Sequence, residues 1–398
     1  MSGESVPSAA PPRAALLVVY LTVFLDLLGF GIILPLLPFY ALKFGANGRE
    51  LGLLFGAFSA AQFFGAFVIG RMSDRLGRRP VLLICLAGTA LAFGATARAE
   101  SLVQLTLARA LAGLFSGSIS TAQAYVADVT RPEERARYMG LVGASIGMGF
   151  VFGPWLGAEL SRFGFRTSAL ASAGLAVLNF TFALVALRES LPRGMHQPSE
   201  RRVSLAPDRL LGALGRPVAG RVLIAGALAT LAFVSMESTF ALLGKQRFDL
   251  GAQRLGRIFG LIGVTMALVQ GLLVGRLARR LGERRLAMLG ALLLAGALFV
   301  LPWMPSLRAT VAVLLALAVG QGLLVPSLAT LLSRDSSAHE QGGVLGIGQS
   351  LGSLARALGP PLAGTLFDQG AARPYVLATV LMLTVVVLIL GARPAPTA

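Results

Sequence analysis

The chain has 398 residues, of which 55% are hydrophobic and only 13% are charged, and its mean hydropathy is +0.76. A water-soluble fold cannot bury so much apolar surface, whereas a lipid bilayer is itself an apolar solvent. The net charge of +17 would suggest nucleic-acid binding in a soluble protein, but here the basic residues lie in short loops between apolar runs. The composition therefore predicts an all-α membrane protein and argues against a nucleic-acid partner.

Twelve apolar runs are long enough to cross a bilayer, which takes about 20 residues of helix. Most connections between them are short, but residues 188–217 form a long polar segment with four prolines. The position of this segment predicts that the chain is divided into an N-terminal six-helix bundle (1–187), a cytoplasmic linker (188–217) and a C-terminal six-helix bundle (218–398). The runs, in chain order, are 15–39, 51–70, 80–97, 102–127, 138–160, 167–187, 218–243, 255–275, 286–304, 309–332, 342–366 and 374–392.

An internal repeat supports the division into two halves. Gly70–Arg79 reads GRMSDRLGRR and Gly275–Arg284 reads GRLARRLGER, and each segment follows the second run of its half. Two six-helix halves in parallel repeat are a known transporter architecture, with the substrate site near the midplane between them. The loops near residues 75, 135 and 280 carry four, three and five arginines. The positive-inside rule therefore places both termini in the cytoplasm.

Four charged residues lie well inside apolar runs: Asp26, Arg109, Glu237 and Arg356. An unpaired charge there costs at least about 2.5–3.5 kcal/mol, so such groups normally pair or face water. At a rise of about 1.5 Å per residue, Asp26 and Arg109 fall at similar depths, as do Glu237 and Arg356. We expect two pairs, which are either structural ion pairs or a proton-coupling site. A carboxyl group in a water-accessible cavity can exchange a proton, and this favours proton relay through Asp26 or Glu237.

Six amide side chains also fall inside the runs. They are candidates for a substrate cavity that binds an amphipathic solute through hydrogen bonds. For each of them, a hydrogen bond between helices is the alternative role. The candidates are Gln62, Gln123, Asn179, Gln270, Gln321 and Gln349.

The segment GRMSDRLGRRP, which begins at Gly70, resembles the signature loop of the major facilitator superfamily. We expect a helix to end at Gly70 and a tight turn to follow. The resemblance implies a conformational switch in which Asp74 accepts hydrogen bonds at the N-terminus of the eleventh span, and Arg78 meets Asp128. The candidate switch residues are Gly70, Asp74, Arg75, Gly77, Arg78, Arg79 and Asp128.

Further segments narrow the resemblance. Leu107–Gly113 is similar to the family's intramembrane-arginine motif, and Gly149–Gly157 resembles the antiporter motif of proton-coupled drug exporters. Leu25–Gly31 resembles the first span of twelve-span drug:proton antiporters, and Tyr125–Thr130 is similar to tetracycline exporters. Those exporters carry an aspartate in the third span where this chain has Ala92, and this difference argues against tetracycline as the substrate.

The antiporter-like segment has a physical meaning of its own. Gly149, Gly153 and Gly157 recur every fourth residue and form one smooth helix face, and Pro154 removes a backbone hydrogen bond. We expect a close, bendable contact between the two halves here, with plain small-residue packing as the alternative.

The resemblance implies a secondary active transporter of the cell inner membrane that exports small hydrophobic or cationic compounds in exchange for protons by alternating access. Such a protein would contribute to drug efflux and antibiotic resistance, and we expect a monomer. The alternatives are a metabolite or lipid-like solute carrier on the same fold and a non-transporting sensor. The sequence has no phosphate-binding loop and no nucleophile–base or metal-ligand pattern, so we expect neither an enzyme nor a cofactor or metal site.

Overall fold

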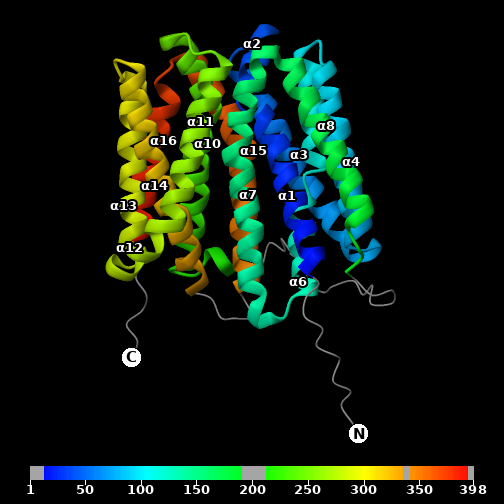
Figure 1. The fold of residues 1–398 in the computed structure, drawn as a ribbon. Coiled ribbons are helices and arrows are strands. Elements are labelled where there is room, and N and C mark those ends of the chain that lie inside the picture. The colour runs from blue at the N-terminus through cyan, green and yellow to red at the C-terminus, as the bar shows by residue number, and fades with distance from the viewer. Residues whose placement is uncertain (1–12, 191–211, 335–340, 393–398) are drawn as a thin grey trace, which may run out of the picture.

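The computed structural model describes residues 13–190, 212–334 and 341–392, and the structural statements below concern these residues. Within them the chain is helical and has no strand. Long helices run side by side across the molecule (Figure 1). Eleven helical segments are long and apolar enough to cross a membrane. Helix α15 (Gln341–Gln369) corresponds to the predicted run 342–366; it is as long as α3 (Gly48–Leu76), at 29 residues, and packs against α3 and α10 (Ala219–Phe248). The predicted all-α fold of two six-helix bundles is therefore confirmed.

The first half contains α1 (Arg13–Ile33), α2 (Leu37–Lys43), α3 (Gly48–Leu76), α4 (Arg78–Arg98), α5 (Leu102–Leu114), α6 (Ser118–Val129), α7 (Pro132–Leu160), η1 (Ser161–Phe163) and α8 (Phe165–Ala186). The second half contains α10 (Ala219–Phe248), α11 (Ala252–Leu268), the π-helical segment η2 (Val269–Leu273), α12 (Val274–Leu281), α13 (Glu283–Val300), η3 (Leu301–Trp303), α14 (Leu307–Arg334), α15 (Gln341–Gln369) and α16 (Arg373–Gly391). The part of the predicted linker at 191–211 lies outside the described residues.

Two predicted spans of the first half are broken helices. The first span divides into α1 and α2 near Pro35, which has no backbone N–H to continue the helical ladder. The fourth span divides into α5 and α6 at residues 115–117, where the side chain of Phe115 packs against Gly88 of α4. Ser118 therefore begins a new helix inside the fourth span.

Helix α3 does not end at Gly70, as the hydropathy predicted, but at Leu76. The apolar run ends where the bilayer does, while the backbone hydrogen bonds continue through the polar residues that follow. The helix stops at Gly77, whose φ of 100° favours glycine. Gly282 has a φ of 77° at the equivalent place in the second half, between α12 and α13. The sequence repeat is thus also a repeat of backbone conformation.

The two halves touch at one end of the molecule and separate towards the other. Helix α1 begins and α16 ends at the lower end in Figure 1, which we call the terminal face, and the opposite end is the distal face. Near the distal face α3 and α15 are in backbone contact, since a Cβ on Gly52 would lie 2.2 Å from the carbonyl oxygen of Pro360. Gly70 lies about five turns further along the same side of α3, and a Cβ there would have no atom within 4 Å. The halves are therefore in backbone contact near the distal face, and α3 is free of such contact at Gly70 near the terminal face.

A carboxylate joins the halves at the closed end. Asp368, near the end of α15, accepts hydrogen bonds from the backbone nitrogens of Gly48 at 2.7 Å and Arg49 at 2.8 Å. These nitrogens belong to the first turn of α3, where free N–H groups and the helix dipole favour an anion. The same turn carries a capping box formed by Asn47 and Glu50. The distal contact is therefore partly electrostatic.

Candidate functional site

A cavity of about 350 Å³ lies between the two halves. Its size falls in the range of small-molecule sites. Its wall is mainly apolar and includes five phenylalanines, and four charged side chains face it from both halves. The lining residues are Asp26, Leu27, Phe30, Leu34, Phe55, Phe58, Ser59, Gln62, Thr89, Phe93, Arg109, Ala112, Ser116, Ile119, Phe150, Val234, Glu237, Ser238, Arg356 and Pro360. All four intramembrane charges noted in the sequence thus meet in one cavity.

Asp26 of α1 is held by a serine rather than by an arginine. The hydroxyl of Ser118 donates a hydrogen bond to Oδ2 of Asp26 at 2.5 Å. Ser118 is placed there because α6 begins at this residue, after the break in the fourth span. Asp26 has no ion pair within 4.0 Å among the described residues, so the predicted pair with Arg109 is absent from this structure. Similar depth in the membrane did not bring the two side chains together.

Arg109 of α5 is 1% exposed and packs against aromatic rings. Its guanidinium carbon lies 4.5 Å from the ring centroid of Phe58 and 5.2 Å from that of Phe30. These cation–π contacts stabilise the charge but supply no hydrogen-bond acceptor. Nε and Nη1 are buried and have no hydrogen-bond partner. Arg109 is therefore a buried cation, and two of its three guanidinium nitrogens have no acceptor among the described residues.

Glu237 of α10 and Arg356 of α15 line the same cavity without forming a direct ion pair in the described structure. Their charges are close enough to interact electrostatically. The guanidinium of Arg356 donates instead to the hydroxyl of Ser353, one turn earlier on its own helix, at 3.2 Å. The two residues therefore share the cavity as predicted, but they are not in contact.

The amide candidates occupy four different environments. Gln62 lines the cavity. Asn179 is buried and donates a hydrogen bond from Nδ2 to the carbonyl oxygen of Thr22 at 2.9 Å, which is the alternative role considered for it. Gln321 is buried with its side-chain oxygen unpartnered. Gln123, Gln270 and Gln349 are exposed and do not line the cavity.

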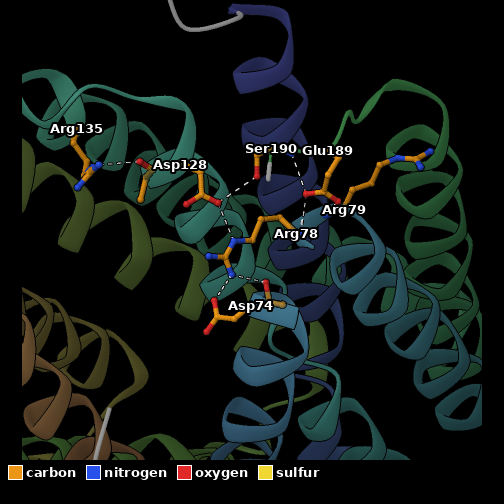
Figure 2. Close-up of polar contacts among 9 residues, drawn as sticks. Asp74, Arg78, Arg79, Asp128, Arg135, Glu189 and Ser190 are labelled. Atoms are coloured by element: carbon orange, nitrogen blue, oxygen red, sulfur yellow. Dashed lines mark hydrogen bonds and ion pairs between the residues drawn. The ribbon is translucent and has the colours of Figure 1, made fainter. Parts of the chain in front are cut away.

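The signature loop forms a cluster of ionic contacts at the terminal face (Figure 2). Arg78 donates to Asp74 at 2.6 Å, to Asp128 at 2.9 Å and to the hydroxyl of Ser73 at 3.0 Å. The expected contact between Arg78 and Asp128 is therefore present. Asp74 binds Arg78, and no contact between Asp74 and the N-terminus of α15 is found among the described residues. Arg75, also a candidate, is exposed.

Two residues that the sequence analysis assigned only to the linker join this cluster. The carboxylate of Glu189 accepts hydrogen bonds from the backbone nitrogens of Arg78 at 2.9 Å and Arg79 at 3.2 Å, in the first turn of α4 (Figure 2). Ser190 donates to Asp128 at 3.3 Å. The sequence signal for this contact was an acidic residue shortly after the sixth apolar run. The N-terminus of α4 lacks a side-chain cap, so an acidic side chain was available to accept its hydrogen bonds. Arg79 also donates to the carbonyl oxygen of Leu184 at 2.7 Å.

The glycine face of α7 packs within its own half rather than against the other half. Cβ atoms on Gly149, Gly153 and Gly157 would each lie within 2.7 Å of an atom of α1. The contact with the second half uses a neighbouring face of α7, where a Cβ on Gly256 of α11 would lie 2.8 Å from the carbonyl oxygen of Pro154. The predicted close packing is thus present, but its partner is α1.

Ala92 is fully buried in α4 and does not face the cavity. Its helix contributes Thr89 and Phe93 to the wall instead. The position that holds an aspartate in the exporters this chain resembles therefore lies behind the cavity wall in this structure.

Comparison with known proteins agrees with this architecture. The sequence model of the Major Facilitator Superfamily matches residues 19–360 and 271–398. The chain is 32% identical over 407 aligned residues to human major facilitator superfamily domain-containing protein 10, covering 90% of this chain and 88% of that protein. It is 30% identical over 352 residues to the class E tetracycline resistance protein of Escherichia coli, covering 87% of this chain and 86% of that one.

A solved structure is also similar to this chain in both sequence and fold. The crystal structure described as the human organic anion transporter MFSD10 (TETRAN) superimposes with a TM-score of 0.71 at 30% sequence identity. The alignment covers 95% of this chain and all of that one. The resemblance to tetracycline-type efflux proteins noted from the sequence motifs is confirmed by these matches.

Proposed function

The chain belongs to the major facilitator superfamily and is a membrane transporter, and from this premise we propose that it exports small hydrophobic or cationic compounds in exchange for protons. The observation that carries the proposal is the cavity. It lies between the halves, has a largely apolar and aromatic wall, and exposes two carboxyl groups, Asp26 and Glu237, to a potential substrate. Similarity to proteins named for resistance to tetracycline and to several drugs supports the same assignment.

The carboxyl groups supply the coupling. An ionised carboxylate is costly in an apolar cavity and is stabilised by a bound cation or a bound proton. A cationic substrate and a proton would therefore compete for Asp26 or Glu237. Proton uptake from one side of the membrane would release the substrate there. On the other side the carboxyl group would lose the proton and bind a new substrate molecule, so that each cycle exchanges substrate for protons.

The mechanism is alternating access by movement of the bundles 1–187 and 218–398 about the cavity. The structure corresponds to a state with the distal face closed. To reach the other state, the α3–α15 and α7–α11 contacts at that face have to separate and the terminal face has to close. Closure would bring Asp74 to the N-terminus of α15, the contact expected from the signature loop. Asp368 and the first turn of α3 already form the corresponding contact at the distal face.

The arginine-rich loops lie at the terminal face, and on the positive-inside rule this face is cytoplasmic in the cell inner membrane. The described state then faces the cytoplasm and is ready to take up a compound for export. One chain supplies both sides of the cavity, which supports a monomeric transporter.

The proposal is tested in proteoliposomes with a pH-sensitive dye. Substrate-driven proton movement should occur with the natural chain and should be lost in Asp26→Asn, with the variant still folded. Glu237→Gln tests the second carboxyl group in the same way. Normal proton movement in both variants would show that these carboxyl groups do not couple transport to protons.

The names of the relatives mention different solutes, although the proteins belong to one family. One is named for tetracycline resistance and another for organic anions. The charge preference of this chain therefore depends on its cavity side chains and not on its fold.

A further inference from the structure

We propose that Ser118 is the positioning residue of the proton site, and that its hydroxyl holds the Asp26 carboxylate in the deprotonated form that binds a cationic substrate. The inference deepens the proposed function, because it rests on Asp26 as a group that exchanges a proton. It assigns to one neutral side chain the pH at which this carboxyl group gives up its proton. Ser118 belongs to α6, so the fourth span as well as the first would set this pH.

The first argument is the hydrogen bond itself. Ser118 is 1% exposed, and its hydroxyl donates to Oδ2 of Asp26 at 2.5 Å. Asp26 is only partly buried and lines the cavity, whereas Ser118 is not part of the cavity wall. A donor directed at a carboxylate favours the ionised form. No ion pair and no second hydrogen bond to Asp26 is found among the described residues, so this contact is what compensates its charge.

A hydroxyl suits a partner group that has to change its protonation state. It both donates and accepts hydrogen bonds, so it can donate to the carboxylate and accept from the protonated carboxyl group. An arginine or lysine in the same place would have no acceptor and would hold the carboxylate ionised more strongly. With a neutral partner, a proton and a cationic substrate are able to compete for Asp26.

The second argument is the helix start at Ser118. Ser118 is the first residue of α6, a helix of 12 residues whose N-terminus has no side-chain cap. The first turn of a helix has N–H groups without intrahelical partners and carries the positive end of the helix dipole, and both favour an anion. The break in the fourth span therefore places a helix start, inside the predicted run 102–127, beside the carboxylate of Asp26.

The third argument is that packing from two neighbouring helices holds this break in place. A Cβ on Gly88 of α4 would lie 2.1 Å from the ring of Phe115, so the ring occupies the space that a side chain would take there. A Cβ on Gly65 of α3 would lie 2.4 Å from the carbonyl oxygen of Leu114. These contacts fix the residues just before Ser118 against both helices. The hydroxyl is therefore positioned by the packing of the first half.

Other ionisable groups also act on Asp26, and they stay the same when Ser118 is replaced. Helices α7 and α8 pack against α1, but their ionisable side chains lie in their first two turns or their last turn. Tyr125 and Asp128 of α6 lie about two turns or more beyond Ser118. The groups that share the cavity with Asp26 or interact with its charge are Cys85 of α4, Arg109 of α5, Glu237 of α10 and Arg356 of α15. A difference between the natural chain and a Ser118 variant thus isolates the hydrogen bond.

The competing explanation is that Ser118 serves only to start α6. Its replacement would then lower the melting temperature and leave the protonation of Asp26 unchanged. The two explanations differ in a titration of the carboxyl group, which needs no transported compound.

The test follows the protonation of Asp26 in the detergent-purified full chain by infrared spectroscopy at a series of pH values. The C=O stretching band of a carboxyl group disappears when the group ionises, and the part of the band that is lost in Asp26→Asn belongs to Asp26. Ser118→Ala should keep Asp26 protonated to a higher pH and move the titration midpoint up by about one pH unit or more, because the ionised form loses its donor. Ser118→Thr retains a hydroxyl and should titrate close to the natural chain.

Ser116→Ala is the matched control. Ser116 lines the cavity beside the same break, but its hydroxyl donates to the carbonyl oxygen of Gly113 at 2.7 Å. This variant should titrate like the natural chain. The inference is wrong if Ser118→Ala has the midpoint of the natural chain, or if Ser116→Ala moves it as far. Should Ser118→Ala fail to fold, Ser118→Cys, whose thiol is a weak donor, replaces it with the same expected direction, and an unchanged midpoint there would overturn the inference.

These outcomes are separate from those for the proposed function. Proton coupling is measured as proton movement in Asp26→Asn, whereas the role of Ser118 is measured as the titration midpoint of a carboxyl group. A midpoint that depends on Ser118, together with normal proton movement in Asp26→Asn, would retain the assignment of Ser118 and overturn coupling through Asp26. Lost proton movement in Asp26→Asn with an unchanged midpoint in Ser118→Ala would do the reverse.

Discussion

Asp368→Asn should shift the molecule away from the state that is closed at its distal face. Asp368 accepts hydrogen bonds from two backbone nitrogens of the first turn of α3, at 2.7 and 2.8 Å. Asparagine keeps one acceptor oxygen, places an N–H₂ group against the other backbone donor and removes the charge. The substitution therefore loses one charge-assisted hydrogen bond and the favourable interaction with the helix N-terminus.

The size of this effect follows from the exposure of the site. A hydrogen bond to a charged group contributes about 1.5–3 kcal/mol when buried, and an anion at an exposed helix N-terminus about 0.3–1 kcal/mol. Asp368 is exposed, so solvent screening reduces both contributions, and a combined loss of about 1–2 kcal/mol is reasonable. This corresponds to a change of about 5–30-fold in the ratio of the two states.

Cysteine labelling measures that ratio. The chain has one cysteine, Cys85, which is buried and replaceable by alanine. Leu34→Cys in this background places a thiol in the cavity wall, which a membrane-impermeant maleimide added from the distal side reaches only when that side opens. Asp368→Asn should label faster than the parent. Asp249→Asn, an exposed acid at the end of α10 that pairs with Lys245, is the control and should not. Equal labelling of Asp368→Asn and the parent would refute the reasoning.

Three further predictions concern other parts of the molecule. In a thermal-stability cycle, Glu237→Gln and Arg356→Gln should be non-additive by less than about 1 kcal/mol, because their charges interact without contact; a larger value would indicate a direct pair. Gly77→Ala should lower the free energy of unfolding more than Gly282→Ala does. Both glycines have positive φ, but only at Gly77 would the new methyl group meet a carboxylate oxygen, that of Glu189, at 2.6 Å. Equal losses of melting temperature in the two variants would contradict this. A reporter fused after Glu200 should read cytoplasmic, and an external reading would reverse the proposed orientation.

The spans were predictable because hydropathy records which residues lie in lipid. Helix boundaries were less so, as α3 shows by continuing through polar residues beyond Gly70 to Leu76. The broken fourth span was missed, and with it the contact of Ser118 with Asp26, because a turn inside the membrane leaves the apolar run intact. Hydropathy therefore located the helices but not their interruptions.

The sequence predicted how deep in the membrane each charged residue of the site lies, but not which neighbour its side chain faces. Counting residues placed Asp26 and Arg109 at one level, yet a helix rotates by 100° per residue and the count does not fix which neighbour a side chain meets. The same limit applies to Gln270, which is exposed although it lies within a span. The contact between Arg78 and Asp128 was predicted because the motif fixes both residues relative to their helix ends.

The position of the α3–α15 contact has a mechanical consequence. Because the backbones touch near Gly52, that contact acts as a pivot close to one end of a long lever. Gly70 is about 27 Å further along α3 at 1.5 Å per residue. Tilting α3 by roughly 10° about the pivot displaces Gly70 by about 5 Å, which is about half of the usual 8–10 Å separation between packed helix axes. A small rotation is thus sufficient to close the aqueous path at the terminal face before the α3–α15 contact at the distal face separates.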